Sequence, residues 1–358
     1  MEQLKNIPAL LESIRSSEGD GLICDEEAIA NEYQSQQQEK SNLAIKVLSI
    51  FGGLLSALAF TGFLAILGVY DSETAMVILG VWFIASGILL ARKFDKLIID
   101  TFAVALFILG LIPFIVGLKS LDFNDTVIVF AVVLVAFLCL LFSKNYILTF
   151  ISVIVIGGAF LVLIALHDVY DAVHLYIVFF ACLMTYAFLN EAKLLADHRT
   201  WTKFYDPIRI GLVFCFLFGL IAIGKKDLIP ISQNFIWVSS IVIMALLILM
   251  VSYILSILEI ESKNQKVWIY TLCILTLLPI LFAPSISGAL LLILLSFKVS
   301  YKTGVAIGAI ALIYFVVQYY YDLSLSLLIK SIILFASGVV FLLLYLYISK
   351  KFKHDEKV

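Results

Sequence analysis

Residues 125–166 read DTVIVFAVVLVAFLCLLFSKNYILTFISVIVIGGAFLVLIAL, and this stretch decides the fold class. Its only charged residues are Asp125 at the start and Lys144 in the short Ser-Lys-Asn break. Each apolar run is close to the ~20 residues that an α-helix needs to cross the hydrocarbon of a bilayer. A buried helix of a soluble protein would show polar residues at regular spacing, and these runs do not. The stretch therefore predicts two transmembrane helices joined by a short loop.

The same pattern continues along most of the 358-residue chain. Hydrophobic residues make up 63% and charged residues 14% of it, whereas soluble domains carry about 25% charged residues. The mean hydropathy is +1.10. We expect an all-α, polytopic transmembrane helical bundle of about 12 spans, or about 10 to 12 if the short tenth segment is half of a re-entrant hairpin. The apolar segments are residues 44–69, 74–91, 98–118, 125–142, 146–166, 172–189, 207–223, 235–258, 267–283, 286–297, 303–320 and 323–348.

The composition divides the chain into three parts. Residues 1–43 are polar and predict a small N-terminal cytoplasmic helical hairpin, in which Asp25 caps the second helix. Residues 44–348 form the transmembrane helical domain, and residues 349–358 form a basic cytoplasmic tail. The hairpin is too small for a core of its own, so we expect it to dock on the membrane domain or on a protein partner.

The positions of the basic residues predict the orientation. With twelve spans, 18 of the 24 Lys and Arg residues, Arg209 among them, lie at loops and ends on the N-terminal side, and only Lys119, Lys225 and Lys226 lie in opposite loops. Lys and Arg collect in cytoplasmic loops. We therefore expect a multi-pass protein of the bacterial inner (plasma) membrane with both termini in the cytoplasm. The opposite loops are too short to hold a catalytic or receptor domain.

Lys330 is the charged residue that the sequence places inside a span. It lies about seven residues into segment 323–348, and so ~10 Å deep. Asp322, Ser326 and Ser337 project to the same side of that helix. One interpretation is an intramembrane site for ion coupling or for an anionic substrate, with Lys330 as the counter-charge. The other is a structural polar cluster that fixes this helix against its neighbours.

A second polar group stands between the fifth and sixth spans and comprises His167, Asp168, Asp171 and His174. On a continuous helix, His167, Asp171 and His174 would share one face, at a spacing suited to zinc. The turn between the two spans must fall within this stretch, however, so we favour a solvated cluster at the outer face. Proton relay by His174 is a further alternative.

Two prolines interrupt predicted spans at similar strings. Pro113 lies in LGLIPFI, residues 109–115, and Pro279 lies in LTLLPIL, residues 275–281. In a repeat of six plus six spans these positions would be equivalent, and matched proline interruptions point to the binding region of a transporter. We expect helix kinks at both prolines, although leucine-rich segments also match by chance.

No catalytic or cofactor motif stands out. GxxxxGK[ST], TVGYG, HExxH and Cys/His clusters are all missing from the sequence. We therefore expect no catalytic, cofactor-binding or metal-binding residues and no nucleic-acid partner. The lipid bilayer is the main expected partner. The favoured hypothesis is a transporter-like protein for a small solute, ion or lipid-like molecule of unknown identity. The alternative is a non-transporting membrane scaffold or partner-binding component of an envelope complex, and an enzyme ranks last.

The C-terminal string YYYDLSLSLLIKSIILFASG, residues 319–338, carries a family resemblance. It is similar to the end of an uncharacterised bacterial family of polytopic membrane proteins, a domain of unknown function whose members read Tyr-Tyr, Leu, Leu-Leu-x-Lys-Ser and then Ser-Gly. The matching positions are Tyr320, Tyr321, Leu323, Leu327, Leu328, Lys330, Ser331, Ser337 and Gly338. The resemblance implies a bacterial inner membrane and no particular activity.

Overall fold

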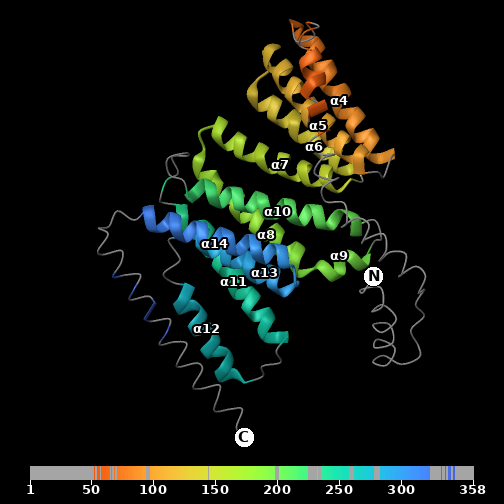
Figure 1. Ribbon diagram of the computed structural model, residues 1–358. Helices are drawn as coiled ribbons and strands as arrows, with labels where there is room; N and C mark the ends of the chain where they lie inside the picture. Colours follow the sequence, from red (N-terminus) through yellow and green to blue (C-terminus); the bar gives the residue numbers. More distant parts are fainter. Residues whose placement is uncertain are drawn as a thin grey trace, which may run out of the picture. The chain divides into compact units, whose positions relative to one another are not determined.

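A computed structural model of the chain contains only helices, turns and loops among the residues that it describes, as predicted for an all-α fold (Figure 1). The chain divides into two compact units, residues 1–121 and residues 122–358. The structure describes residues 52, 55–56, 58–64, 66, 68, 71–93, 97–143, 145–197, 201–224, 232, 235–257, 262–277, 283–322, 332, 335, 338–339 and 342.

Eight of the described helical segments are long and apolar enough to cross a membrane. They coincide with eight of the twelve segments predicted from run length, namely the second to the eighth and the eleventh. The chain is therefore a multi-pass helical membrane protein. The helices are α4 (Glu73–Lys93), α5 (Leu97–Ser120), α6 (Asp125–Phe142), α7 (Tyr146–Leu166), η2 (Tyr170–Ala172) continued by α8 (Val173–Leu189), α10 (Trp201–Gly224), α11 (Ile236–Ile257) and α14 (Lys302–Asp322).

Two other predicted segments correspond to shorter helices. α12 (Lys263–Leu277) and α13 (Pro284–Lys298) have 15 residues each. At 1.5 Å per residue α13 covers about 22 Å, less than the ~30 Å of hydrocarbon in a bilayer, whereas α12 is described only up to Leu277. A third short helix, α9 (Glu191–Asp197), joins α8 to α10. The predicted N-terminal hairpin and basic tail lie outside the described residues, as do most of the first and last predicted spans, so the count of twelve stays a prediction.

In unit 1, α4 and α5 pack against each other at glycines. A Cβ on Gly110 would lie 2.8 Å from the carbonyl oxygen of Gly80, and one on Gly117 would lie 2.9 Å from the backbone nitrogen of Val77. No side chain fits in these positions without moving a helix. Small residues allow membrane helices to approach closely enough for backbone contacts, so the glycines set the spacing of this pair.

In unit 2, α8 and α10 lie at the centre of one continuous apolar core. α10 packs against α7, α8 and α13, and α8 packs against α11 and α13 (Figure 1). The largest side chains in this core include Ile177, Met184, Phe216 and Leu291, all buried. The centre of the unit is thus filled mainly by apolar groups, with the hydrogen bond from the Tyr176 hydroxyl to the carbonyl of Cys215 as a polar contact within it.

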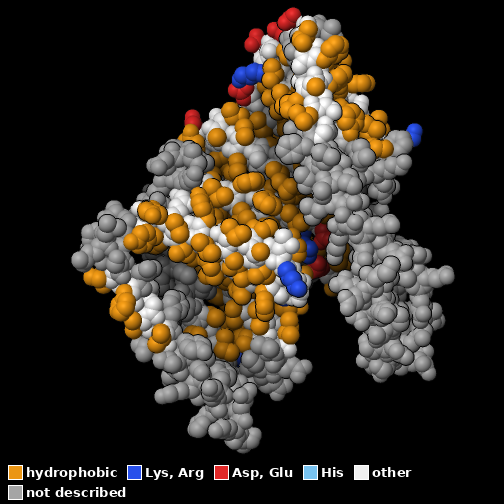
Figure 2. All heavy atoms as spheres, viewed as in Figure 1, with side chains coloured by type: hydrophobic (Ala, Val, Ile, Leu, Met, Phe, Trp, Pro, Cys, Tyr) orange, Lys and Arg blue, Asp and Glu red, His pale blue; other side chains and the backbone are white. Residues whose placement is uncertain are grey.

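The surface of the described helices is apolar. Figure 2 shows hydrophobic side chains over most of the described surface on view, with few charged ones among them. Large examples include Phe130, which is 58% exposed, and Ile310, which is 69% exposed. Contiguous apolar surface of this extent is unfavourable in water. A lipid bilayer is the environment in which it is stable.

Candidate functional site

Polar contacts in unit 2 gather at the two ends of its packed helices. At one end, Lys298 Nζ of α13 donates to the carbonyl of Leu189, the last residue of α8, at 3.2 Å. At the other, the Ser285 hydroxyl of α13 donates to the carbonyl of Leu220 in α10, at 3.1 Å. The charged end comprises Glu191, Tyr205, Asp206, Arg209, Lys298 and Tyr301. The neutral end comprises His174, Leu220, Ser239, Ser240 and Ser285.

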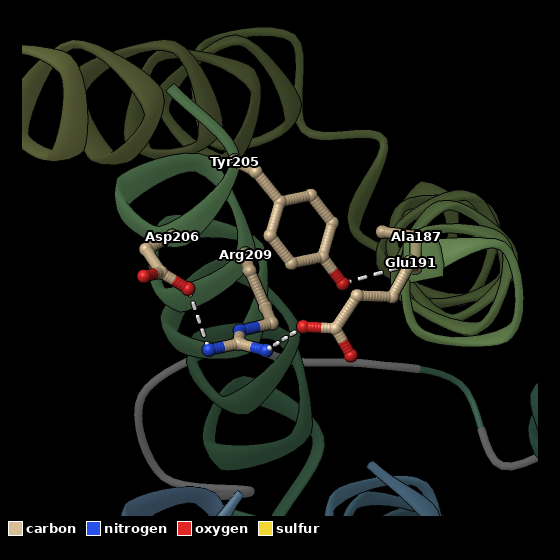
Figure 3. Close-up of polar contacts among 5 residues, drawn as sticks. All are labelled: Ala187, Glu191, Tyr205, Asp206 and Arg209. Atoms are coloured by element: carbon tan, nitrogen blue, oxygen red, sulfur yellow. Dashed lines mark hydrogen bonds and ion pairs between the residues drawn. The ribbon is translucent and has the colours of Figure 1, made fainter. Parts of the chain in front are cut away.

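Arg209 is the centre of the charged end. It lies eight residues after the start of α10 and is only 7% exposed. One guanidinium nitrogen donates to Glu191 Oε1 of α9 at 2.8 Å, and the other donates to Asp206 Oδ1 of α10 at 2.6 Å (Figure 3). One guanidinium therefore serves two carboxylates, and the three side chains together carry a formal charge of −1.

Aromatic rings surround the same guanidinium. Its central carbon lies 4.1 Å from the ring centroid of Tyr301, 5.1 Å from that of Tyr205 and 5.7 Å from that of Phe188. Distances within about 6 Å allow attraction between a cation and a ring face. The Tyr205 hydroxyl also donates to the carbonyl of Ala187 at 3.0 Å, which fixes that ring between α8 and α10 (Figure 3).

A cavity of about 310 Å³ adjoins Arg209. Its wall includes Glu191, Asp206 and the two tyrosines of the charged end, together with Ser300 in the turn between α13 and α14. Ser300 has a left-handed backbone, with φ +56°. The residue after it, Tyr301, donates its backbone N–H to the carbonyl of Ser296 at 2.8 Å. This tight turn places the Tyr301 ring beside the guanidinium.

The charged end perturbs acid–base equilibria outside the predicted spans. Partial burial raises the pKa of Glu191, the Asp206 charge adds to that rise, and the Arg209 guanidinium opposes it. Partial burial also raises the pKa of the Tyr301 hydroxyl, so this group stays protonated. Among the described residues no group of three or more His, Cys, Asp or Glu side chains could hold a metal ion. The arrangement is suited to exchanging protons and ion-pair partners.

Several buried polar atoms in unit 2 have no hydrogen-bond partner. At the neutral end they are His174 Nε2 and Ser240 Oγ, and at the charged end they include Thr185 Oγ1 and Ser296 Oγ. His174 and Thr185 are eleven residues apart on α8, so they share a face about 16 Å apart. The side chains buried along α8 between them are apolar, such as Ile177, except for Tyr176, whose hydroxyl donates to the carbonyl of Cys215 in α10 at 3.0 Å. A largely apolar core therefore separates two ends whose polar atoms have unused hydrogen-bonding capacity.

The predicted site around Lys330 is not tested by these contacts. Lys330, Ser326, Ser337 and Pro279 all lie outside the described residues. Asp322 is the last described residue of α14, and the residues between it and Lys330 also lie outside the described part of the chain. The polar stripe and the kink at Pro279 stay predictions. Pro113 is buried inside α5, whose helix continues through it from Leu97 to Ser120.

The four residues of the predicted outer cluster lie close in sequence but bond to different groups. His174 departs from the expected solvated loop, because α8 begins at Val173 and its side chain is 1% exposed. The other three are exposed or half-buried. The contacts are His167 Nε2 with Thr126 Oγ1 at 3.2 Å, Asp168 with the Tyr170 hydroxyl at 2.6 Å, Asp171 with the Ser232 backbone N–H at 2.9 Å, and His174 Nδ1 with Ser239 Oγ at 3.0 Å.

Arg209 is a site residue that the sequence analysis did not single out. It was counted only among the basic residues at the loops and ends of the predicted cytoplasmic side, near the start of the seventh apolar segment at residue 207. Helix α10 already covers residues from Trp201 onward, and this places Arg209 within the helix. The i, i+3 spacing of Asp206 and Arg209 is the local signal that a helix already covers these residues.

The fold and this site define a multi-pass α-helical membrane protein with a buried ion-pair network at one end of its helices. The chain belongs to the family described as a domain of unknown function, DUF4401, which matches residues 42–351. The prediction of an uncharacterised family is thereby confirmed. No curated protein and no solved structure matches the chain. Its function must therefore be argued from the charged end.

Proposed function

We propose that this protein is a transporter-like carrier of a small polar solute or ion, and that the helices of unit 2 open alternately at their two ends. The cavity beside Arg209 would receive the solute at the charged end. The neutral end, where His174, Ser239 and Ser240 are buried, would open in a second conformation. The ~16 Å of apolar core between the ends would keep the two openings from coexisting.

The ion-pair network, in which Arg209 is buried and its two carboxylate partners are partly exposed, carries this proposal. A buried charge pair is a weak source of stability, because well-packed apolar residues of the same volume often do as well. The network joins α9 to α10 through Glu191 and Arg209, and Tyr301, the residue before α14, lies against the Arg209 guanidinium. Interactions of this kind can be exchanged at modest cost when a helix moves. We infer that the network stabilises the conformation in which the charged end is accessible and the neutral end is closed.

The orientation and the full topology belong to the same proposal. Lys193, Lys203, Lys298 and Lys302 lie in sequence around the charged end, so we propose that this end faces the cytoplasm of a bacterial inner membrane. Twelve crossings would place both termini on that side, where residues 1–43 could bind a protein partner. Reporter fusions after each span would test this, since two successive loops on one side would contradict it.

Cysteine accessibility tests the carrier without knowledge of its solute. A cysteine-free, full-length protein in sealed vesicles would carry Ser300→Cys at the charged end or Ser240→Cys at the neutral end. A membrane-impermeant maleimide would be applied from each side, with and without Arg209→Gln. We expect Arg209→Gln to raise labelling of position 240 at least about fivefold and to lower labelling of position 300, because coupling of 1–3 kcal/mol shifts populations by that order.

Two controls make the result specific. Ser262→Cys, at an exposed position before α12, should label equally in every background. Arg92→Gln removes an exposed arginine at the end of α4 and should leave both cavity positions unchanged. If position 240 stays unlabelled and position 300 stays labelled in all variants, the helices do not move between two states. The scaffold alternative would then replace the carrier.

A further inference from the structure

The network of Arg209, Glu191 and Asp206 holds one more negative charge than its arginine can balance, while Lys298, the other cation of the charged end, donates to the carbonyl of Leu189. Arg209 is shared between Glu191 and Asp206, and both contacts are direct, at 2.8 and 2.6 Å. Two carboxylates on one guanidinium repel each other, and partial burial strengthens this repulsion. Uptake of one cation would bring the three side chains to neutrality.

The two carboxylates are not equivalent. The Asp206 side chain is 55% exposed, and water stabilises its charge. The Glu191 side chain is only 22% exposed and lies deeper in the same site. The cost of keeping a charge away from water therefore falls on Glu191, in agreement with the rise of the Glu191 pKa that burial causes.

We propose that Glu191 is the proton-binding site of the carrier, and that a proton is its coupling ion. The inference rests on the proposed function above. A hydronium ion in the cavity would transfer one proton to the free oxygen of Glu191: one O–H bond of the hydronium ion breaks, one O–H bond forms on the carboxyl group, and a neutral water molecule is left. The neutral acid would keep an acceptor for Arg209 but lose the charge attraction, while Asp206 would retain the guanidinium. The link between α9 and α10 would weaken, and the neutral end would open.

A metal cation fits this site poorly. Alkaline-earth ions take about six or more oxygen ligands, whereas one oxygen of each carboxylate here is already bonded to Arg209. The positive guanidinium itself stands between the two carboxylates (Figure 3). A proton needs only a single oxygen atom and no coordination shell. The geometry therefore favours a proton over a metal ion.

Other charged and titratable groups around Glu191 come from every neighbouring helix. α10 contributes Tyr205, Asp206 and Arg209, and α9 itself carries Lys193 and Asp197. The remaining groups act from α7, from α13 and from the turn before α14, and they are Tyr146, Lys298 and Tyr301. Of these, Arg209 and Lys298 oppose proton uptake by Glu191, and Asp206 favours it.

The test measures labelling of Ser240→Cys against pH in full-length protein, normalised at each pH to Ser262→Cys so that thiol reactivity cancels. In the otherwise unchanged protein, the relative rate should rise at least fivefold as pH falls through the raised Glu191 pKa. Glu191→Gln should be fast at every pH and show no pH dependence. Asp206→Asn removes the repelling charge, so its response should move to lower pH. Glu73→Gln, an exposed carboxylate of α4, should keep the original profile.

Each outcome decides the matter. If Glu191→Gln keeps the original pH response, Glu191 does not bind the proton. If exchanging potassium for sodium chloride at constant pH and ionic strength shifts the rate instead, a metal cation is the ligand. Either result overturns the proton assignment. The proposal of a carrier would still stand after either result if Arg209→Gln raises labelling at position 240 and lowers it at position 300. The two proposals can therefore fail independently.

Discussion

The α4–α5 pair of unit 1 and the charged end of unit 2 hold helices together in opposite ways. At Gly80 and Gly110 the side chains are absent and backbone meets backbone, with 2.8 Å between the carbonyl oxygen of Gly80 and an added Cβ on Gly110. At Arg209 a long side chain reaches across to α9 and to the residue before α14. The glycine contact depends on the absence of side chains at Gly80 and Gly110. The other contact depends on the Arg209 guanidinium, which pairs with two carboxylates and lies beside three aromatic rings.

The difference indicates which part can move. Between helices in lipid there is little hydrophobic driving force, so close van der Waals packing and polar contacts decide stability. Backbone packing at glycines has one favourable geometry and fixes α4 against α5. An arginine with two carboxylates and three nearby rings can exchange partners while remaining paired. We therefore expect unit 1 to behave as a rigid pair and the charged end of unit 2 to carry the conformational change.

Removal of the guanidinium should have the largest effect. Arg209→Ala leaves Glu191 and Asp206 facing each other without a counter-charge, and breaking a buried ion pair in this way costs about 3 kcal/mol. The free energy of unfolding in mixed detergent micelles measures this loss. Arg92→Ala, at an exposed arginine, should cost less than about 0.5 kcal/mol. Equal losses in the two variants would show that the network contributes no stability.

A side chain added at the glycine contact between α4 and α5 should have the second largest effect on stability. Gly110→Leu directs a side chain into the carbonyl oxygen of Gly80 and the backbone of Ile84, which cannot yield as a flexible side chain could. Overpacking of this kind costs about 1–3 kcal/mol. Gly158→Leu is the matched control, because a Cβ at Gly158 meets nothing within 4 Å. A loss in the control as large as in Gly110→Leu would attribute the effect to leucine itself and not to the helix contact.

The same two regions show what the sequence could and could not predict. Run length alone located eight spanning helices, because the hydrocarbon requires about 20 apolar residues whatever their neighbours are. The Arg209 network could not be found in this way. Its partners Glu191 and Tyr301 lie 18 residues before and 92 residues after it in sequence, and only tertiary packing brings them together.

His174 is missed for a related reason. Hydropathy places the end of the fifth span and the start of the sixth within a few residues of each other, so the stretch from His167 to His174 reads as an exposed loop. The turn is shorter than that, because η2 leads directly into α8 at Val173. His174 therefore lies in the first turn of α8, where its imidazole is buried and bonded to Ser239. The boundary of an apolar run does not locate the first turn of a helix to within one or two residues.

A single hydroxyl in the network should have a smaller effect than either of the first two changes. Tyr205→Phe keeps the ring beside Arg209 and removes the hydroxyl that donates to the carbonyl of Ala187. Such a bond contributes about 1 kcal/mol, and the loss should be of that size in the same unfolding assay. Tyr186→Phe, at a tyrosine that is 59% exposed, should be neutral. A neutral Tyr205→Phe would mean that packing of the ring, and not its hydroxyl, holds α8 to α10.

The smallest effect should be the pH dependence that Glu191 adds to stability. Its pKa in the folded protein lies above the ordinary value of 4.5 because burial disfavours the charged carboxylate. A raised folded-state pKa gives stability that is fully present below pH 4.5 and is lost as pH rises through the folded value. As pH rises, the unfolding free energy of the unchanged protein should therefore fall relative to that of Glu191→Gln. Glu73→Gln should show no such trend. A difference that moves in the opposite direction would mean that Arg209 outweighs burial, and the charged end would then hold its two carboxylates ionised throughout the cycle.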